Sequence, residues 1–181
     1  MIERLSFLNK KYIIEGEKVF LRPITAEDTP LILKWRNSSE VKRYFIYQKD
    51  LTEEDHMNWL NTKVRSGEVV QFVIHEKESG QPVGSIYYHD VDPYYEKAEY
   101  GIFIGEAESK GKGIGTEAGQ LFTKFGFEEL KLHKIYLRVL ADNNKAIRSY
   151  EKIGFSQEGY FKDEVKISGK FHDVIFMAMF H

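Results

Sequence analysis

The residues best suited to chemistry form a glycine-rich loop, Lys110-Gly111-Lys112-Gly113-Ile114-Gly115-Thr116. The loop lies between a strand-like run, residues 98–104, and a run with helical periodicity. Alternating glycines at a helix N-terminus leave backbone N–H groups bare, and the helix dipole favours negative charge there. Together with the two lysines, this pattern predicts a binding site for a pyrophosphate group. The alternative is that the glycines only make a tight turn between strand and helix.

Two common phosphate-binding loops do not match. A P-loop requires Gly-x-x-x-x-Gly-Lys-Ser/Thr, which does not occur in this chain. A dinucleotide-binding loop requires Gly-x-Gly-x-x-Gly near the start of a βαβ unit. Here the spacing is Gly-x-Gly-x-Gly, and it follows a series of strands that reads as an antiparallel meander. The loop therefore indicates a different phosphate-bearing ligand.

Composition limits the classes of function. The chain has 181 residues, a net charge of −2, no basic tract and no cysteine. We therefore expect no nucleic-acid partner, no thiolate metal site and no cysteine nucleophile, and we predict no metal. No apolar run is long enough to span a membrane, so we expect no membrane partner and a cytoplasmic protein. Residues 1–18 read as an N-terminal extension and residues 19–181 as one domain.

The elements that must position the loop alternate between strands and helices. Thr25-x-x-Asp28 and Thr52-x-x-Asp55 resemble capping boxes that open two helices, and Gly154 suits the C-terminus of a later helix. The predicted strands are residues 19–22, 69–75, 83–89, 98–104, 134–140, 159–165 and 171–180. This order predicts an α/β fold with a mixed sheet and helices on both faces.

Two motifs resemble the GCN5-related N-acetyltransferase (GNAT) family. Lys110-x-x-Gly113-x-Gly115 is similar to the family's acetyl-CoA signature, Gln/Arg-x-x-Gly-x-Gly/Ala, with Lys in the first place. The run from Asn143 through Tyr150-Glu151-Lys152-Ile153-Gly154-Phe155 resembles a second family motif. Near the N-terminus, Leu21-Arg22-Pro23 and Trp35-Arg36-Asn37 resemble the branch that acetylates ribosomal-protein N-termini, spermidine and aminosugar nucleotides.

The resemblance implies a single-domain fold with a strongly twisted mixed sheet, and acetyl-CoA as cosubstrate. It implies that Phe103 and Ile104 pair with the pantetheine arm and that Asn143 contacts CoA, although Asn143 also suits a helix N-cap. The loop residues expected at the pyrophosphate are Lys110, Gly111, Lys112, Gly113, Ile114, Gly115 and Thr116. With no cysteine, direct attack by the amine is the simpler course.

Two residues are the candidates for proton transfer. By family position, Tyr150 is the general acid that protonates the CoA sulfur; the alternative is a core aromatic residue on its helix stripe. Glu99 is the candidate general base, and strand alternation places it on the face of Gly101 and Phe103. The alternatives to Glu99 are a structural carboxylate at this position, His89 or Asp90 as the base, or water alone.

The acceptor side is defined by charge and aromatic residues. Acidic residues near Glu99 alternate with tyrosines, which suits a cationic amine or an exposed hairpin. Arg36 or Arg43 would suit an anionic group such as a nucleotide-sugar phosphate; the alternative for both is an arginine solvated at the surface. We predict an N-acetyltransferase that acts on a primary amine of a small molecule, of polyamine or aminosugar type. The alternatives are acetylation of a protein N-terminus and a non-catalytic CoA-binding regulatory domain. A homodimer is left open.

Overall fold

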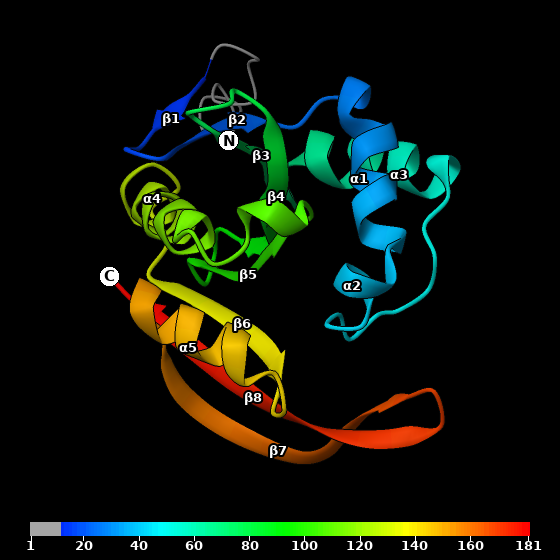
Figure 1. Ribbon diagram of the computed structural model, residues 1–181. Coiled ribbons are helices and arrows are strands. Elements are labelled where there is room, and N and C mark those ends of the chain that lie inside the picture. Colours follow the sequence, from blue (N-terminus) through cyan, green and yellow to red (C-terminus); the bar gives the residue numbers. More distant parts are fainter. Residues whose placement is uncertain (1–11) are drawn as a thin grey trace.

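The structure, a computed structural model, describes residues 12–181 and contains one twisted mixed sheet (Figure 1). The strand order is β1-β2-β3-β4-β5-β6-β8-β7; β5 and β6 run parallel and the other neighbours are antiparallel. The strands are β1 (Ile14–Glu15), β2 (Val19–Pro23), β3 (Val70–Glu76), β4 (Pro82–Asp92), β5 (Lys97–Ile104), β6 (Lys134–Leu140), β7 (Ser156–Ile167) and β8 (Lys170–Phe180). The helices are α1 (Thr29–Asn37), α2 (Ser39–Lys42), α3 (Glu53–Trp59), α4 (Ile114–Glu128) and α5 (Asn144–Ile153), with helical turns η2 (Ala26–Asp28), η3 (Leu60–Val64) and η4 (Ala107–Ser109).

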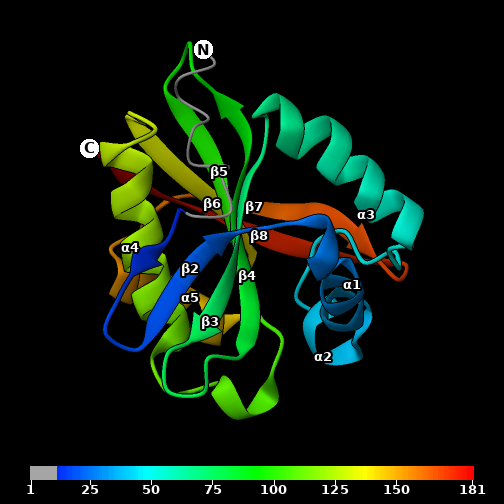
Figure 2. The ribbon, with the colours of Figure 1, turned by 90° about the horizontal axis from the view of Figure 1, so that it is seen from above.

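Helices cover both faces of the sheet, as the sequence predicts. Helices α4 and α5 lie on one face and α1, α2 and α3 on the other (Figure 2). Each face has its own core: Phe72 and Phe122 belong to the core under α4, while Val73 and Trp35 belong to the core under α1. Strand β3 is buried on both sides, which explains its nearly continuous apolar run. Within residues 12–181 no helix is long and apolar enough to cross a membrane.

Two elements differ from those expected. The predicted extension, residues 1–18, contains β1, which pairs with β2 through Ile14 and Leu21; residues 1–11 lie outside the described part of the chain. Helix α2 was not predicted. It begins after Ser38, whose Oγ accepts a hydrogen bond from the Val41 N–H at 3.3 Å. With only four residues, α2 is too short for apolar periodicity to reveal.

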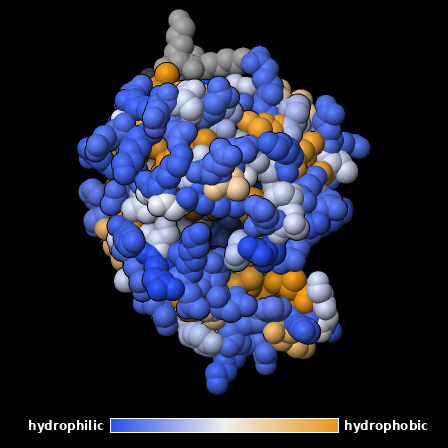
Figure 3. Space-filling view, in the orientation of Figure 1, coloured by the Kyte–Doolittle hydropathy of each residue, from blue (hydrophilic) through white to orange (hydrophobic). Residues whose placement is uncertain are grey.

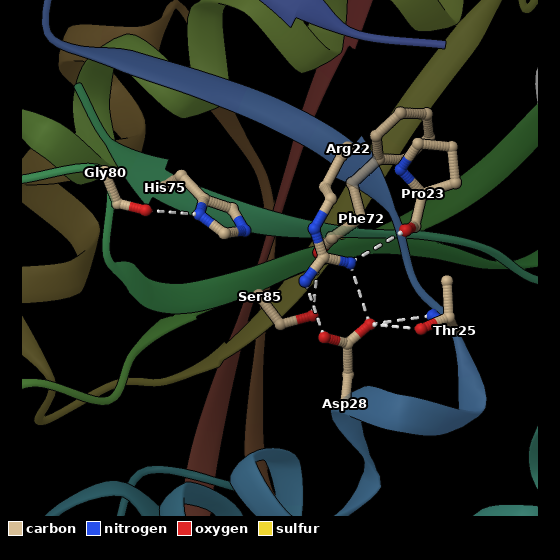
Figure 4. Close-up of polar contacts among 8 residues, drawn as sticks. All are labelled: Arg22, Pro23, Thr25, Asp28, Phe72, His75, Gly80 and Ser85. Carbon is tan, nitrogen blue, oxygen red and sulfur yellow. Dashed lines mark hydrogen bonds and ion pairs between the residues drawn. The ribbon is translucent and has the colours of Figure 1, made fainter. Parts of the chain in front are cut away.

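A buried ion pair attaches α1 to the sheet. The Arg22 guanidinium at the end of β2 donates to both carboxylate oxygens of Asp28, at 2.8 and 2.6 Å. The Thr25 N–H donates to the same carboxylate at 2.8 Å, which confirms the predicted capping contact (Figure 4). Asp28 immediately precedes the first residue of α1. This cluster therefore sets where α1 begins, and α1 carries Trp35 and Arg36.

The Asp28 cluster makes a pH-dependent contribution to stability. Burial alone would raise the pKa of Asp28, but hydrogen bonds from Arg22 and Thr25 outweigh it and hold the pKa below its usual range. The stabilisation is therefore present above the unfolded-state pKa of about 3.9 and is lost as the pH falls through the depressed folded-state pKa. Asp28→Asn should lower the free energy of unfolding at pH 7 by about 1–3 kcal/mol.

Urea denaturation at pH 7 and pH 3 measures this effect. The difference between wild type and Asp28→Asn should shrink at pH 3, because the unfolded wild-type chain takes up a proton at Asp28 below its pKa of about 3.9, whereas the depressed pKa of the folded state resists protonation. Glu164→Gln, which changes an exposed carboxylate of β7, is the matched control and should change neither value. A pH-independent loss in Asp28→Asn would mean that packing, not charge, accounts for its effect.

Candidate active site

The cleft begins where two parallel strands separate. Strands β5 and β6 pair only through Lys97–Lys134, Ala98–Ile135 and Glu99–Tyr136. Beyond Glu99 the strands diverge, although β5 remains paired with β4 and β6 with β8. A cleft of about 1170 Å³ opens there and is lined from both faces of the sheet. Figure 3 shows a hollow between the upper body of the molecule and the part formed by α5, β6 and the β7–β8 hairpin.

The facing edges of the separated strands are free to bind an extended ligand. Backbone groups that have lost their neighbouring strand can pair with any chain that runs alongside them. Gly101, Ile102, Phe103 and Ile104 of β5 all line the cleft. The position of Phe103 and Ile104 at this edge is the one expected for residues that pair with a pantetheine arm.

The glycine loop forms one end of the cleft. Gly111 and Gly113 have φ angles of 82° and 85°, and Gly113 is the N-cap of α4. The cleft is lined by Lys110, Gly111, Gly113, Gly115 and Thr116. The first N–H groups of a helix have no partner within it, so the N-terminus of α4 offers donors and a positive dipole end to this cleft.

Two predicted loop residues point away from the cleft. The Lys112 ammonium pairs with Glu76, with Nζ 3.2 Å from Oε1. The Ile114 side chain is 2% exposed and belongs to the core under α4. Any contact of these two residues with a phosphate would therefore come from their backbone N–H groups. Lys110, in contrast, lines the cleft and pairs with Glu40 at 3.5 Å.

Helix α5 forms the wall facing β5. Asn143 lines the cleft, and its Oδ1 accepts a hydrogen bond from the Ala146 N–H at 3.2 Å, so it is also the N-cap of α5. Lys145, Arg148 and Lys152 line the same cleft, and no ion pair involves them among residues 12–181. Sequence reasoning missed these cations because they resemble an ordinary solvated helix face. Their spacing at i, i+3 and i+7 places the three cations on one face of the helix and would have revealed them.

Tyr150 lies on α5 and faces the cleft. Its ring packs edge-on against Tyr100 and Phe155, with centroids 6.1 and 6.0 Å away. Its hydroxyl makes no hydrogen bond to a residue of the described chain. Burial, followed by the nearby Tyr87, raises the pKa of Tyr150, so the phenol stays protonated at neutral pH. Tyr150 thus packs against the core under α4 and also lines the cleft as a protonated phenol.

Glu99 is buried in the cleft beside an arginine. Its oxygens accept hydrogen bonds from Arg138 Nε at 2.8 Å and Nη2 at 3.1 Å. His89, opposite Glu99 on β4, places Nε2 3.7 Å from Glu99 Oε1 and Nδ1 2.9 Å from Asp90 Oδ2. Phe103 lies four residues after Glu99 on β5, so strand alternation predicts that the two side chains share a face. Phe103 belongs to the core under α1. All the candidate bases therefore occupy one corner.

The same corner has the donor set of a cation site. His89, Asp90 and Glu99 each offer a ligand atom, and these atoms lie within 4.8 Å of one another. The Arg138 guanidinium already forms an ion pair with the Glu99 carboxylate, and its positive charge would repel a metal cation bound there. The absence of a metal therefore remains a prediction from the sequence.

The half of the cleft on the α1 side is the candidate acceptor half. Its lining includes Arg36, Phe45, His56, Trp59 and Tyr87. The Tyr87 ring lies over Gly101, its partner on β5, so that any Cβ at Gly101 would overlap the ring. Burial raises the pKa of Tyr87 to about 12. The sequence offered no clue to this contact, because Tyr87 and Gly101 become neighbours only through strand pairing.

The acidic and tyrosine-rich region divides between the cleft, the core and an exposed turn. Glu99, His89, Tyr87 and Tyr100 line the cleft. Tyr88 of β4 is fully buried in the core under α4, and the remainder lies at or in the exposed turn between β4 and β5, where Tyr94 is 84% exposed. The exposed-hairpin interpretation is therefore correct for that turn, and only the strand residues contribute to the candidate site.

Comparisons with known proteins agree with this geometry. Residues 18–156 match the model of a family described as "Acetyltransferase (GNAT) domain". The chain is 31% identical over 165 residues to the spermidine N(1)-acetyltransferase of Escherichia coli K12, covering 91% of this chain and 87% of that protein. It is 34% identical to a putative ribosomal N-acetyltransferase of Bacillus subtilis, over 55% of this chain and 54% of that protein. The structure of the Vibrio cholerae spermidine N-acetyltransferase in complex with CoA and spermine superposes with a TM-score of 0.84 at 25% identity, covering 91% and 96% of the two chains.

The glycine loop can be tested at Gly115. A Cβ at Gly115 would lie 3.7 Å from Ile104 Cγ1, an ordinary contact, whereas any side chain at Gly113 would strain a left-handed backbone. Gly115→Val should therefore fold while blocking a phosphate from the N-terminus of α4. We expect the Kd for acetyl-CoA to rise by about 100-fold, because the variant would lose about two charge-assisted hydrogen bonds to the phosphate.

Titration calorimetry gives the affinity, and thermal unfolding reports the fold. Lys124→Val introduces the same β-branched residue on the exposed side of α4 and should bind acetyl-CoA normally. Unchanged affinity in a folded Gly115→Val protein would show that the loop is only a turn.

Proposed function

Because this chain belongs to the GNAT acetyltransferase family, we propose that its cleft transfers the acetyl group of acetyl-CoA directly to a primary amine of a small molecule. The observation that carries the proposal is the separation of β5 from β6, with the N-terminus of α4 at one end and Tyr150 and Glu99 on opposite sides. We retain residues 19–181 as the catalytic domain, with β1 added at the sheet edge. A cytoplasmic location and a homodimer remain predictions.

The chain's own groups fit the cosubstrate. The phosphates would lie at the N–H groups of α4 and near Lys110, with Lys145, Arg148 and Lys152 supplying further positive charge. Phe103 and Ile104 would pair with the pantetheine amides along the free edge of β5. Acetyl-CoA supplies an activated thioester carbonyl. A backbone N–H of β5 close to that carbonyl would stabilise the developing oxyanion.

Three proton movements complete the transfer: one from the ammonium to the base before attack, one from the acid to the sulfur, and one from the nitrogen of the adduct back through water to the phenolate left on Tyr150. The amine must lose a proton before its lone pair attacks the carbonyl carbon, because an alkylammonium has a pKa near 10. Glu99 takes up that proton through water, next to His89. As the C–S bond breaks, the sulfur takes a proton from the Tyr150 hydroxyl, which has no competing partner within the described chain. The acid lies on the α5 side of the sheet and the base on the α1 side.

The acceptor is the open part of the proposal. The spermidine acetyltransferases among the relatives support a polyamine, while the cationic lining on the α1 side supports an aminosugar with an acidic group. Release of free CoA from acetyl-CoA in the presence of an amine panel tests both. A non-catalytic CoA-binding domain would bind acetyl-CoA without turnover, and a protein N-terminal acetyltransferase would use only peptide amines.

Tyr150→Phe tests the acid. The variant keeps the ring contacts with Tyr100 and Phe155 and removes only the hydroxyl. Turnover should fall by about 100-fold, the usual scale for a lost general acid. The Kd for acetyl-CoA should stay near the wild-type value. Stopped-assay kinetics and calorimetry measure the two quantities; a wild-type rate would reduce Tyr150 to a core residue.

Glu99→Gln tests the base. Turnover should fall by about 100-fold or more at neutral pH and recover partly as the pH nears the amine's own pKa. Arg138→Gln is the paired variant: it removes the guanidinium that donates to Glu99 and leaves the carboxylate itself in place. The pH–rate profile of Arg138→Gln should therefore keep the dependence on a base that Glu99→Gln loses.

The two profiles separate the roles of Glu99. If Glu99 only anchors Arg138, both variants should lose activity alike without a change in the shape of the profile. If Glu99→Gln raises only the KM of the acceptor, Glu99 is a substrate contact. His89→Gln and Asp90→Asn then identify the base.

A further inference from the structure

Among residues 12–181, Arg36 is a buried charge without a counter-ion. It lies near the end of α1, is 8% exposed, and lines the acceptor half of the cleft. Its guanidinium stacks on Phe45, 3.6 Å from the ring centroid, and Nη2 donates to the Tyr47 carbonyl oxygen at 3.3 Å. Nη1 is buried and has no hydrogen-bond partner. One donor edge of the guanidinium is therefore left unsatisfied.

The carboxylates of the cleft are engaged elsewhere. Three acidic residues line it: Glu40 pairs with Lys110, Asp55 accepts from the Thr52 N–H, and Glu99 pairs with Arg138. None of them forms an ion pair with Arg36, and no other carboxylate of residues 12–181 does so. The protein thus holds this positive charge away from water without neutralising it.

Such an arrangement is unfavourable until an anion enters. A buried guanidinium without a partner carries most of its desolvation cost, and an incoming carboxylate or phosphate removes that imbalance through charge-assisted hydrogen bonds. The planar fork of arginine suits these two anions, and its stacking on Phe45 fixes the plane of the fork. Burial lowers the pKa of Arg36, consistent with a charge that lacks compensation.

The position of Arg36 identifies which anion. Helix α1 lies on the face of the sheet opposite α4, whose N-terminus is the candidate phosphate site for the cosubstrate (Figure 2). Phe45, under the guanidinium, packs against Phe103 of β5, 5.9 Å between centroids. An anion at Arg36 therefore lies on the acceptor side of β5, close to the edge where the transfer would occur.

We propose that Arg36 is a specificity-determining residue that binds a phosphate or carboxylate carried by the acceptor amine. The inference rests on the proposed acetyl transfer. It selects, from the two acceptor types, an amine that bears an acidic group over an all-cationic polyamine. Lysine-like cationic acceptors are repelled by the same charge.

Matched acceptors test the proposal directly. Glucosamine 6-phosphate against glucosamine isolates a phosphate, ornithine against putrescine isolates a carboxylate, and spermidine represents the polyamines. Wild type should show the higher kcat/KM for the acidic member of at least one pair. Arg36→Gln should reduce that preference by about 10- to 100-fold, mainly through the acceptor KM. The phosphate and carboxylate pairs distinguish the two anions.

Three variants serve as controls. Arg65→Gln removes an exposed arginine at the end of η3 and should leave the preference intact. Arg36→Lys keeps the charge and should restore part of the preference. Arg43→Gln removes the exposed arginine that also lines the cleft; loss of the preference here, but not in Arg36→Gln, would overturn the assignment.

Other results of these assays would contradict the proposed anion site. Spermidine as the best acceptor, with no penalty in Arg36→Gln, contradicts the proposal. An equal loss of kcat/KM in Arg36→Gln for both members of each pair also contradicts the proposal, because it indicates a structural role. A raised KM for acetyl-CoA in Arg36→Gln contradicts it as well, because it indicates a contact with the cosubstrate. Calorimetry of glucosamine 6-phosphate and ornithine with the CoA-loaded protein is independent of turnover. Arg36-dependent binding without turnover supports the anion site and refutes the proposed activity; no binding of either compound to wild type refutes the anion site.

Discussion

The divergence of β5 from β6 is the constraint on which the site depends. A parallel pair that stops after Glu99 leaves two strand edges facing each other without hydrogen-bond partners. The strands remain in place because each has a second neighbour, β4 for β5 and β8 for β6. The sheet can therefore remain open in its middle without fraying. The same opening connects its two faces, so that an acid from one side and a base from the other reach a shared space.

Close backbone approach shapes this opening. A Cβ at Gly101 would overlap the Tyr87 ring, and a Cβ at Gly105 would overlap Trp35 of α1. Both positions therefore require glycine. These contacts let α1 and the long aromatic side chains lie directly on β5. The α1 side of the cleft is consequently lined by aromatic rings, and charges that are buried there interact more strongly than charges in water. The Arg138–Glu99 pair compensates itself in this environment, whereas Arg36 does not.

The parts of the cleft differ in the charge and the chemistry of the residues that line them. The end formed by α4 and α5 carries the helix N-terminus and unpaired cations, which suits a ligand with several phosphates. The middle carries Tyr150, Glu99 and His89, the groups that we propose for proton transfer. The α1 side carries aromatic rings and a buried arginine. In the proposed function, binding of the cosubstrate, proton transfer and choice of the acceptor therefore depend on different elements.

Local patterns in the sequence were enough to predict several strands, the start of α1 and the cosubstrate. Strand-like runs placed β3 and β5, and alternating apolar residues placed β6, each within a residue or two. The Thr25–Asp28 pair marked the start of α1, and the glycine loop and the motif around Tyr150 indicated acetyl-CoA. These features are readable because each depends on residues close together in sequence. The motif, however, could not show that Lys112 turns toward Glu76 or that Ile114 is core.

Only tertiary structure decided which distant residues meet. The Glu99–Arg138 pair joins residues 39 positions apart, Tyr87 meets Gly101 through strand register, and three α5 cations become cleft residues only once α5 faces β5. Whether Arg36 finds a counter-ion depends on every carboxylate around it, and those come from different elements. Periodicity reports which face of a helix or strand is buried, but burial with or without a partner is a property of the assembled fold.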